Sequence, residues 1–147
     1  MSSSYDDEGT AIVEFVWLSV LLLIPLVYVV LGVFEVQRTA LAASTAARSA
    51  GRAFLTAPTE ASARGRAEQA ARLAFADQGL AETPVEVTTA CQPNPRNCLS
   101  PGSVVTVTLR SSAALPLFPR ILGNNTPRIA VESLHSAPYG TFREDRS

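Results

Sequence analysis

The sequence has no lysine, one histidine and two cysteines in 147 residues. Its twelve basic residues are all arginine, which we attribute to genomic base composition, and a net charge of −1 gives no basic field for nucleic acid. Neither a Gly-x-Ser-x-Gly nor a Ser-x-x-Lys motif occurs, and the acidic residues show no paired spacing. We therefore expect a protein that is not an enzyme, with no metal, cofactor, nucleic acid or small-molecule substrate, and a structural role for His135.

The strongest feature present is an apolar run over residues 15–34 without a charged residue. Twenty residues at about 1.5 Å each make a helix of about 30 Å, the thickness of a bilayer's hydrocarbon core. The run predicts a single transmembrane helix. Pro25 lies inside it, and membrane helices tolerate proline because neighbours re-satisfy the freed carbonyl. A functional bend and a proline without a special role both remain open.

Four residues at the start of the run have a distinctive spacing: Gly9, Thr10 and Glu14 precede it, and Phe15 is its first residue. A peptidase that cut after Gly9 would leave Thr10 with a free amine about one helical turn from the Glu14 carboxylate. In a lipid-free assembly, Glu14 would neutralise that amine, its own or a neighbour's, because a buried charge needs a partner. The alternative is a solvated Glu14 in the headgroup region, since the apolar residues after it already span the membrane core.

A long helix is predicted over residues 10–55, because alanine dominates beyond the apolar run and no proline occurs until Pro58. Small residues recur every four positions in this helix, and such faces let helices approach closely. They suit packing in a filament or against the protein's own domain, or they reflect only an alanine-rich composition. The two lines are Ala42, Ala46 and Ala50, and Ala43, Ala47 and Gly51.

A second helix is predicted from Thr59, as the N-cap, to about Gln78, with Gly79 at its C-terminal cap. From Thr83 the hydrophobic period changes to two, which predicts strands near residues 85–89, 105–110 and 128–132. The fold class is therefore α+β, with a small three-stranded antiparallel sheet. The apolar face of the second helix is expected to contain Ala63, Ala67, Ala70, Leu73 and Ala74.

Cys91 and Cys98 bracket a proline-rich connection between the first two strands. A disulfide there would indicate the oxidising side of a membrane and would stabilise the domain by roughly 2–3 kcal/mol. Two unpaired cytosolic thiols are the alternative. Residues 115–123 are apolar and broken by prolines, and we expect them to pack under the sheet or to press on the bilayer or a neighbouring subunit. The charged tail, residues 141–147, is expected to fray.

The N-terminal stretch reads Asp7-Glu8-Gly9-Thr10-Ala11-Ile12-Val13-Glu14-Phe15 and continues into the Leu/Val run with Pro25. This stretch resembles the TadE-like minor pilins (pseudopilins) of tight-adherence, or Tad/Flp, pilus systems. Those proteins open with Gly-x-x-x-x-Glu-Phe and a leucine-rich helix, then continue into a long helix and a small extracytoplasmic domain. Residues 105–108, 115–117 and 129–133 are similar to the family's C-terminal strands.

The resemblance implies that a prepilin peptidase cuts between Gly9 and Thr10, and that Glu14 serves recognition and assembly. The mature chain would be a minor component of a pilus or secretion apparatus. Its partners would be membrane lipid, the prepilin peptidase, and other pilin and Tad platform subunits. The expected organisation is a leader at residues 1–9, a transmembrane and extended helix at 10–55, and a small extracytoplasmic α+β domain at 56–147.

Orientation is a point of conflict within the sequence. Three arginines follow the apolar run, and the positive-inside rule alone would place the C-terminal domain in the cytoplasm. The cysteine pair and the leader favour the extracytoplasmic side, which we expect for this single-pass protein. Two rival interpretations remain: a membrane-anchored envelope binding module without processing, and a secreted enzyme cut near Ala42.

Overall fold

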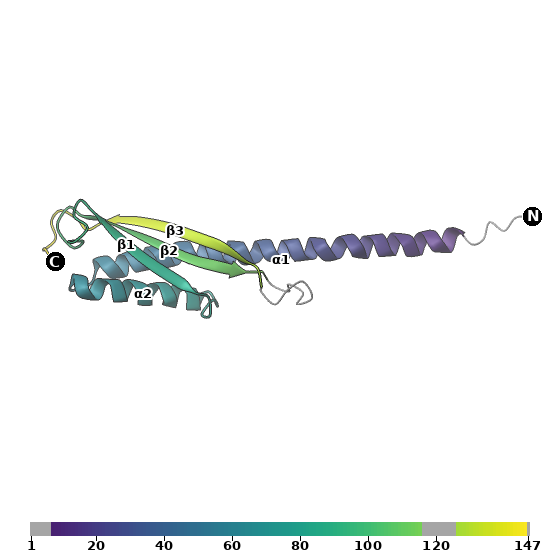
Figure 1. The fold of residues 1–147 in the computed structure, drawn as a ribbon, viewed down its shortest axis with the longest axis horizontal. Coiled ribbons are helices and arrows are strands. Elements are labelled where there is room, and N and C mark those ends of the chain that lie inside the picture. The colour runs from purple at the N-terminus through teal and green to yellow at the C-terminus, as the bar shows by residue number, and fades with distance from the viewer. Residues whose placement is uncertain (1–6, 116–125, 147) are drawn as a thin grey trace, which may run out of the picture. The chain divides into compact units, whose positions relative to one another are not determined.

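The computed structural model describes residues 7–115 and 126–146, with side chains described from Ala11 onward. It is an α+β chain with two helices and a three-stranded antiparallel sheet in the described residues (Figure 1). Its elements in order are α1 (Asp7–Leu55), α2 (Glu60–Asp77), β1 (Val85–Gln92), β2 (Val104–Ala114) and β3 (Arg128–Pro138).

The chain divides into two compact units, Met1–Phe34 and Glu35–Ser147, with the boundary inside α1. In the first unit α1 is an unbroken helix that retains Pro25 in its interior. The first turn of α1 consists of residues 7–10. This first turn places the start of the helix three residues before the predicted start at residue 10.

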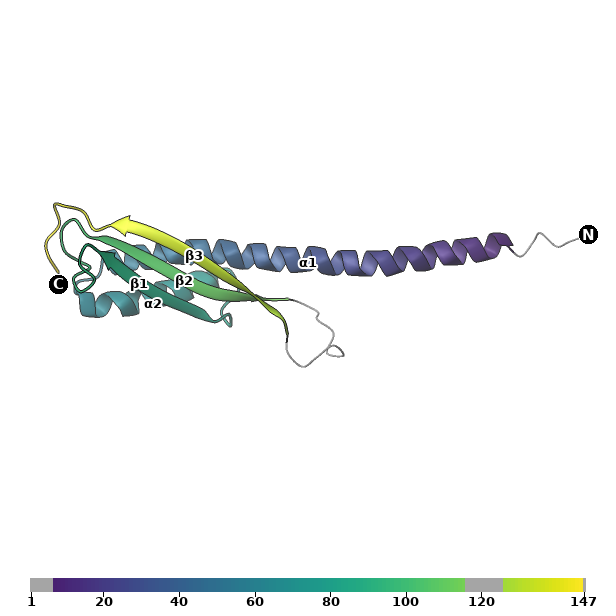
Figure 2. The same ribbon diagram turned by 45° about the horizontal axis from the view of Figure 1, so that its top comes forward.

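In the second unit, both helices contribute to one hydrophobic core with the sheet (Figure 2). β2 is the central strand and pairs antiparallel with β1 and with β3. Alternate residues of β2 are buried, which is the period expected of a strand with one covered face. The buried β2 residues Val105, Val107 and Leu109 pack in one core with residues of both helices. The helix residues include Ala46, Ala50 and Phe54 of α1, and Ala67, Ala71 and Phe75 of α2.

The boundaries of α2 follow from local chemistry. The Thr59 hydroxyl accepts a hydrogen bond from the backbone N–H of Ser62 at 3.4 Å, as an N-cap does. Gly79 has a φ of +71°, a left-handed conformation that is nearly free of cost only for glycine. The Arg38 guanidinium donates to the Gln78 carbonyl at the end of α2, where a cation complements the helix dipole.

Two sequence-based expectations about residue positions need correction here. Leu73 is 64% exposed, whereas Ala71 is fully buried. Leu73 follows Ala71 by two residues, about 200° around a helix of 3.6 residues per turn, so it faces away from the core. Cys91 lies within β1 and not in the loop after it.

The tail also differs from the expectation of fraying. Arg143 and Arg146 donate side-chain hydrogen bonds to the carbonyls of Leu55 and Ala57, at 3.0 and 3.3 Å. Tyr139 is 2% exposed, and its hydroxyl donates to the carbonyl of Glu144 at 2.8 Å. The described tail is therefore fastened to the end of α1.

Candidate functional site

The candidate processing group lies at the start of α1. Gly9 and Thr10 are in the helical backbone, and Glu14 lies four residues beyond Thr10 on the same helix. Residues four apart are neighbours on a helix surface, with Cβ atoms about 5–6 Å apart. If the chain were cut between Gly9 and Thr10, the first turn of the new helix would expose a positive dipole end and a free amine. Glu14 is exposed and would be within reach of both.

An uninterrupted apolar surface follows this group. The large apolar side chains from Phe15 to Phe34 are exposed, Phe15 by 71% and Trp17 by 69%. Leaving one large apolar side chain in water costs about 1.5–3 kcal/mol of free energy relative to burying it. Within the described residues, α1 holds the one helix long and apolar enough to cross a membrane. A long apolar N-terminal helix of this kind is consistent with a single-pass anchor.

The small-residue lines of α1 have a partner within the chain. All the alanines in both lines are fully buried. Gly51 is buried as well, and a Cβ there would lie 3.0 Å from Cδ2 of His135 on β3. Of the alternatives left open by the sequence, packing against the protein's own domain accounts for these residues. His135, opposite Val107 in the sheet, packs against α1 and has a structural position.

Cys91 and Cys98 are joined by a disulfide, with a Cα–Cα distance of 5.3 Å. Both residues are 2–3% exposed. The Cys98 backbone N–H donates to Oε2 of Glu60 at 3.3 Å, which connects this loop to the first turn of α2. The disulfide is therefore part of the domain's packing, and no free cysteine remains.

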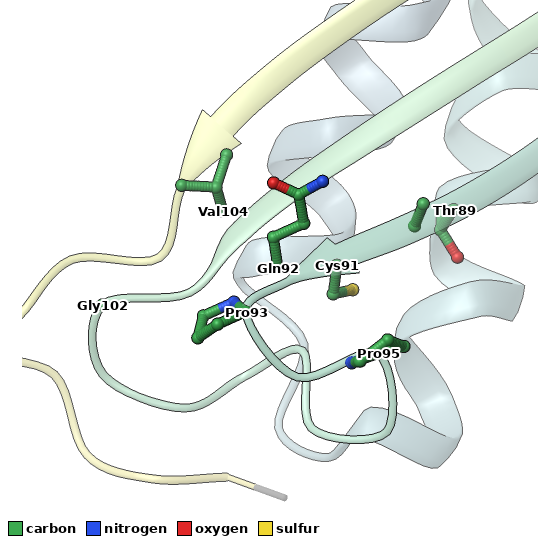
Figure 3. Close-up of a pocket in the computed structure, with 8 residues that line it drawn as sticks. Thr89, Cys91, Gln92, Pro93, Pro95, Gly102 and Val104 are labelled. Atoms are coloured by element: carbon green, nitrogen blue, oxygen red, sulfur yellow. The ribbon is translucent and has the colours of Figure 1, made fainter.

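A shallow hollow lies beside the disulfide at the end of β1 (Figure 3). Pro93, Pro95, Gln92 and Val104 are among its lining residues. The residues that line it carry no charged group and no free thiol.

One charged row crosses the exposed face of the sheet. Arg110 on β2 stands beside Glu86 on β1 and Glu132 on β3. Its Nε donates to Oε2 of Glu132 at 2.9 Å. The hydrogen bond to Glu132, with its charge, raises the pKa of Arg110 above the ordinary arginine value. Glu132 is therefore already paired within its own chain.

The remaining predicted segment, residues 115–123, lies outside the described residues except for Leu115. The Leu115 N–H donates to the carbonyl of Pro127 at 3.1 Å, which continues the β2–β3 pairing by one step. The fastening of the tail to α1 is the feature that sequence reasoning missed. It depends on side chains of residues more than 80 positions from their acceptors, so no local pattern signals it.

Comparisons with known proteins give no relative for this chain. No protein-family model, curated protein or solved structure matches it.

Proposed function

We propose that this chain is a TadE-like minor pilin, or pseudopilin, of a Tad-type pilus or secretion apparatus. Residues 15–34 of α1 anchor it in the cell membrane, and the domain that begins at Glu35 lies on the extracytoplasmic side. A prepilin peptidase cuts after Gly9, and the mature chain acts in pilus assembly without an enzymatic activity. Its partners are membrane lipid, the peptidase, and other pilin and platform subunits.

The observation that carries this proposal is that Gly9, Thr10 and Glu14 lie on one continuous helix with the apolar run, which begins at Phe15. Cleavage at Gly9 would create an amine one turn from Glu14. Within lipid both groups can reach the headgroup region, whereas in a packed filament each would require an opposite charge. The pair would therefore favour assembly with neighbouring helices.

The distribution of buried surface supports the same proposal. The domain uses the small-residue lines of α1 for its own core, so they are not available to other subunits. The apolar side chains from Phe15 to Phe34 have no cover in the described structure. Lipid can cover them in the membrane, and the equivalent helices of other subunits can cover them after extraction from it.

A second candidate function is that of an anchored envelope binding module that is never processed. Phe142 favours it, because this side chain is fully exposed (102%) although the residues around it are fastened to the domain. An exposed aromatic side chain on an ordered segment is a suitable anchor for a binding partner. In this function Glu14 would be an ordinary residue at the membrane boundary.

The N-terminus of the mature chain separates these functions. Mass spectrometry of the native protein should find a chain that starts at Thr10. A start at Met1 or Ser2 would support the binding module, and a start at Ala43 would support a secreted protein.

A variant tests the role of the carboxylate. Glu14→Ala should remain in the membrane fraction but should not support pilus assembly, since the freed amine would have no partner. Glu35→Ala is the matched control, because Glu35 is the first acid after the apolar run and has no such role. Normal piliation by Glu14→Ala would contradict the proposed assembly role.

A further inference from the structure

Both outer edges of the sheet have backbone groups without partners in the described residues. The N–H of Tyr139 donates to the carbonyl of Ser103, and the N–H of Leu115 donates to the carbonyl of Pro127. These two bonds continue the β2–β3 register at its two ends. In an antiparallel ladder, alternate residues of a strand bond to the same neighbour. The odd-numbered residues of β3 therefore bond to β2.

The even-numbered residues of β3 consequently direct their N–H and C=O groups to the open edge, from Arg128 to Ser136. By the same alternation, even-numbered residues of β2 bond to β1, and the odd-numbered residues of β1 face the other open edge. No backbone or side-chain hydrogen bond in the described part of the chain uses these groups. Such edges are templates for another strand.

The open edge of β3 is protected against pairing only by two charged side chains, Arg128 and Glu132. Its register with β2 is continuous over eleven residues, without a bulge. It has no lysine, and its single proline is the last residue, Pro138. Its core-facing residues are only partly covered, since Ile129 is 42% exposed and Val131 is half-buried. Val85 and Val87 on the edge strand β1 are also half-buried.

The direction of the chain limits which strand can pair there. Glu35 and Thr39 line a hollow together with Arg128, at the start of β3. Gly51 lies beside His135, further along β3. Residues 35–51 of α1 therefore run in the same direction as β3, and the chain enters the domain at the end where β3 begins. An antiparallel β3–β3 pair would place the two entry points at opposite ends, which two copies anchored in one membrane cannot satisfy.

We propose that copies of this chain with one shared orientation, displaced along the axis of their assembly, pair edge to edge, with β3 of one copy adding in parallel to β1 of the next. Both strands are antiparallel to β2, so they run in the same direction in neighbouring copies. The outward-directed backbone groups also suit a parallel pair. In such a pair, the N–H and C=O of one residue bond to two residues of the other strand, which are two positions apart. The even-numbered residues of β3 can therefore bond to the odd-numbered residues of β1. The inference rests on the proposed function, in which copies share one orientation.

The charged residues of the two edges select the register of β3 against β1 of the next copy. Without an axial shift, Glu132 would lie beside Glu86 of the next copy, because both residues flank Arg110 in their own sheet. A shift of four residues, about 13 Å, places Arg128 beside Glu86 of the next copy instead. Both side chains are exposed. Arg128 forms no ion pair in the described residues, and Glu86 has only a longer-range attraction to Arg110 of its own chain. The same shift places Ala130 beside Thr88.

Directional cross-linking of the full chain in native membranes tests this arrangement. Two differently tagged copies are co-expressed, one with Ala130→Cys and one with Thr88→Cys, and are treated with a short bismaleimide. The native cysteines are in a disulfide, so each copy offers one reactive thiol. A cross-link between the two tags is expected. A cross-link of Ala130→Cys with itself, or none between the tags, overturns the proposal.

Charge variants of the same pair provide the control. Arg128→Glu in the first copy should reduce the mixed cross-link about fivefold, the upper range for one cross-strand charge pair. Glu86→Arg in the second copy should then restore it. An unchanged yield in Arg128→Glu overturns the register.

The N-terminal mass of the cross-linked chains separates the two proposals. A cross-link between chains that start at Met1 leaves the edge pairing and removes the processing site. Chains that start at Thr10 without a cross-link remove the edge pairing alone.

Discussion

Reduction of the disulfide is expected to lower the stability of the domain by a calculable amount. Cys91 and Cys98 are seven positions apart, so the cross-link closes a short loop. The chain-entropy relation gives about 2.5 kcal/mol at 25 °C for a loop of this size. For a domain of about a hundred residues, a urea dependence of about 1.2 kcal/mol/M converts this loss into a midpoint about 2 M lower.

Pulse proteolysis in a urea series measures the midpoint for the full chain in detergent. Wild-type protein is compared with and without a reducing agent, and the Cys91→Ala/Cys98→Ala variant is the control. The reducing agent should lower the wild-type midpoint and leave the variant unchanged. Because both sulfur atoms are buried, the variant should be less stable than the reduced wild type by the lost packing. Equal midpoints for oxidised and reduced wild type would refute the entropic argument.

Four substitutions test the packing of the domain by the same urea assay. Phe75→Ala should lower the free energy of unfolding by about 3–5 kcal/mol, whereas the exposed Leu73→Ala should change it by less than about 0.5 kcal/mol. Gly51→Val should lower it by about 1–3 kcal/mol, because even a Cβ added at Gly51 would lie only 3.0 Å from His135; equal stability would show that β3 can move. Tyr139→Phe should lower it by about 1 kcal/mol, through loss of the 2.8 Å bond to Glu144, and a tail that frays would show no change.

The sequence predicted the elements that have strong local signals. Thr59 is the N-cap of the second helix, as predicted. The C-cap is Gln78, and Gly79, which was predicted at the cap, follows it with a left-handed backbone conformation. The order of the helices and strands followed from the change of hydrophobic period, and the structure confirms the three-stranded antiparallel sheet.

The length of β3 could not be predicted in the same way. The strand was expected near residues 128–132, but it continues to Pro138. Ser133 and His135 occupy core-facing positions there and are only half-buried, as an edge strand permits. Because these positions do not require apolar side chains, the hydrophobic alternation stops before the strand does. The small-residue lines of α1 were ambiguous for a different reason: an alanine surface shows that something approaches closely, but not what.

The structure also bears on the arginines that set the orientation problem. The positive-inside rule counts basic residues in short loops beside a span, where they are free to interact with the membrane surface. Arg38 is instead used in the fold, since it donates to the carbonyl of Gln78 at the end of α2. Arg48 and Arg52 lie on the part of α1 that packs into the domain core. These three residues therefore belong to a folded domain and not to a loop, and folded domains cross membranes largely regardless of their charge. A disulfide with both cysteines in the core is typical of proteins in an oxidising compartment, so the cysteine pair supports the proposed extracytoplasmic side.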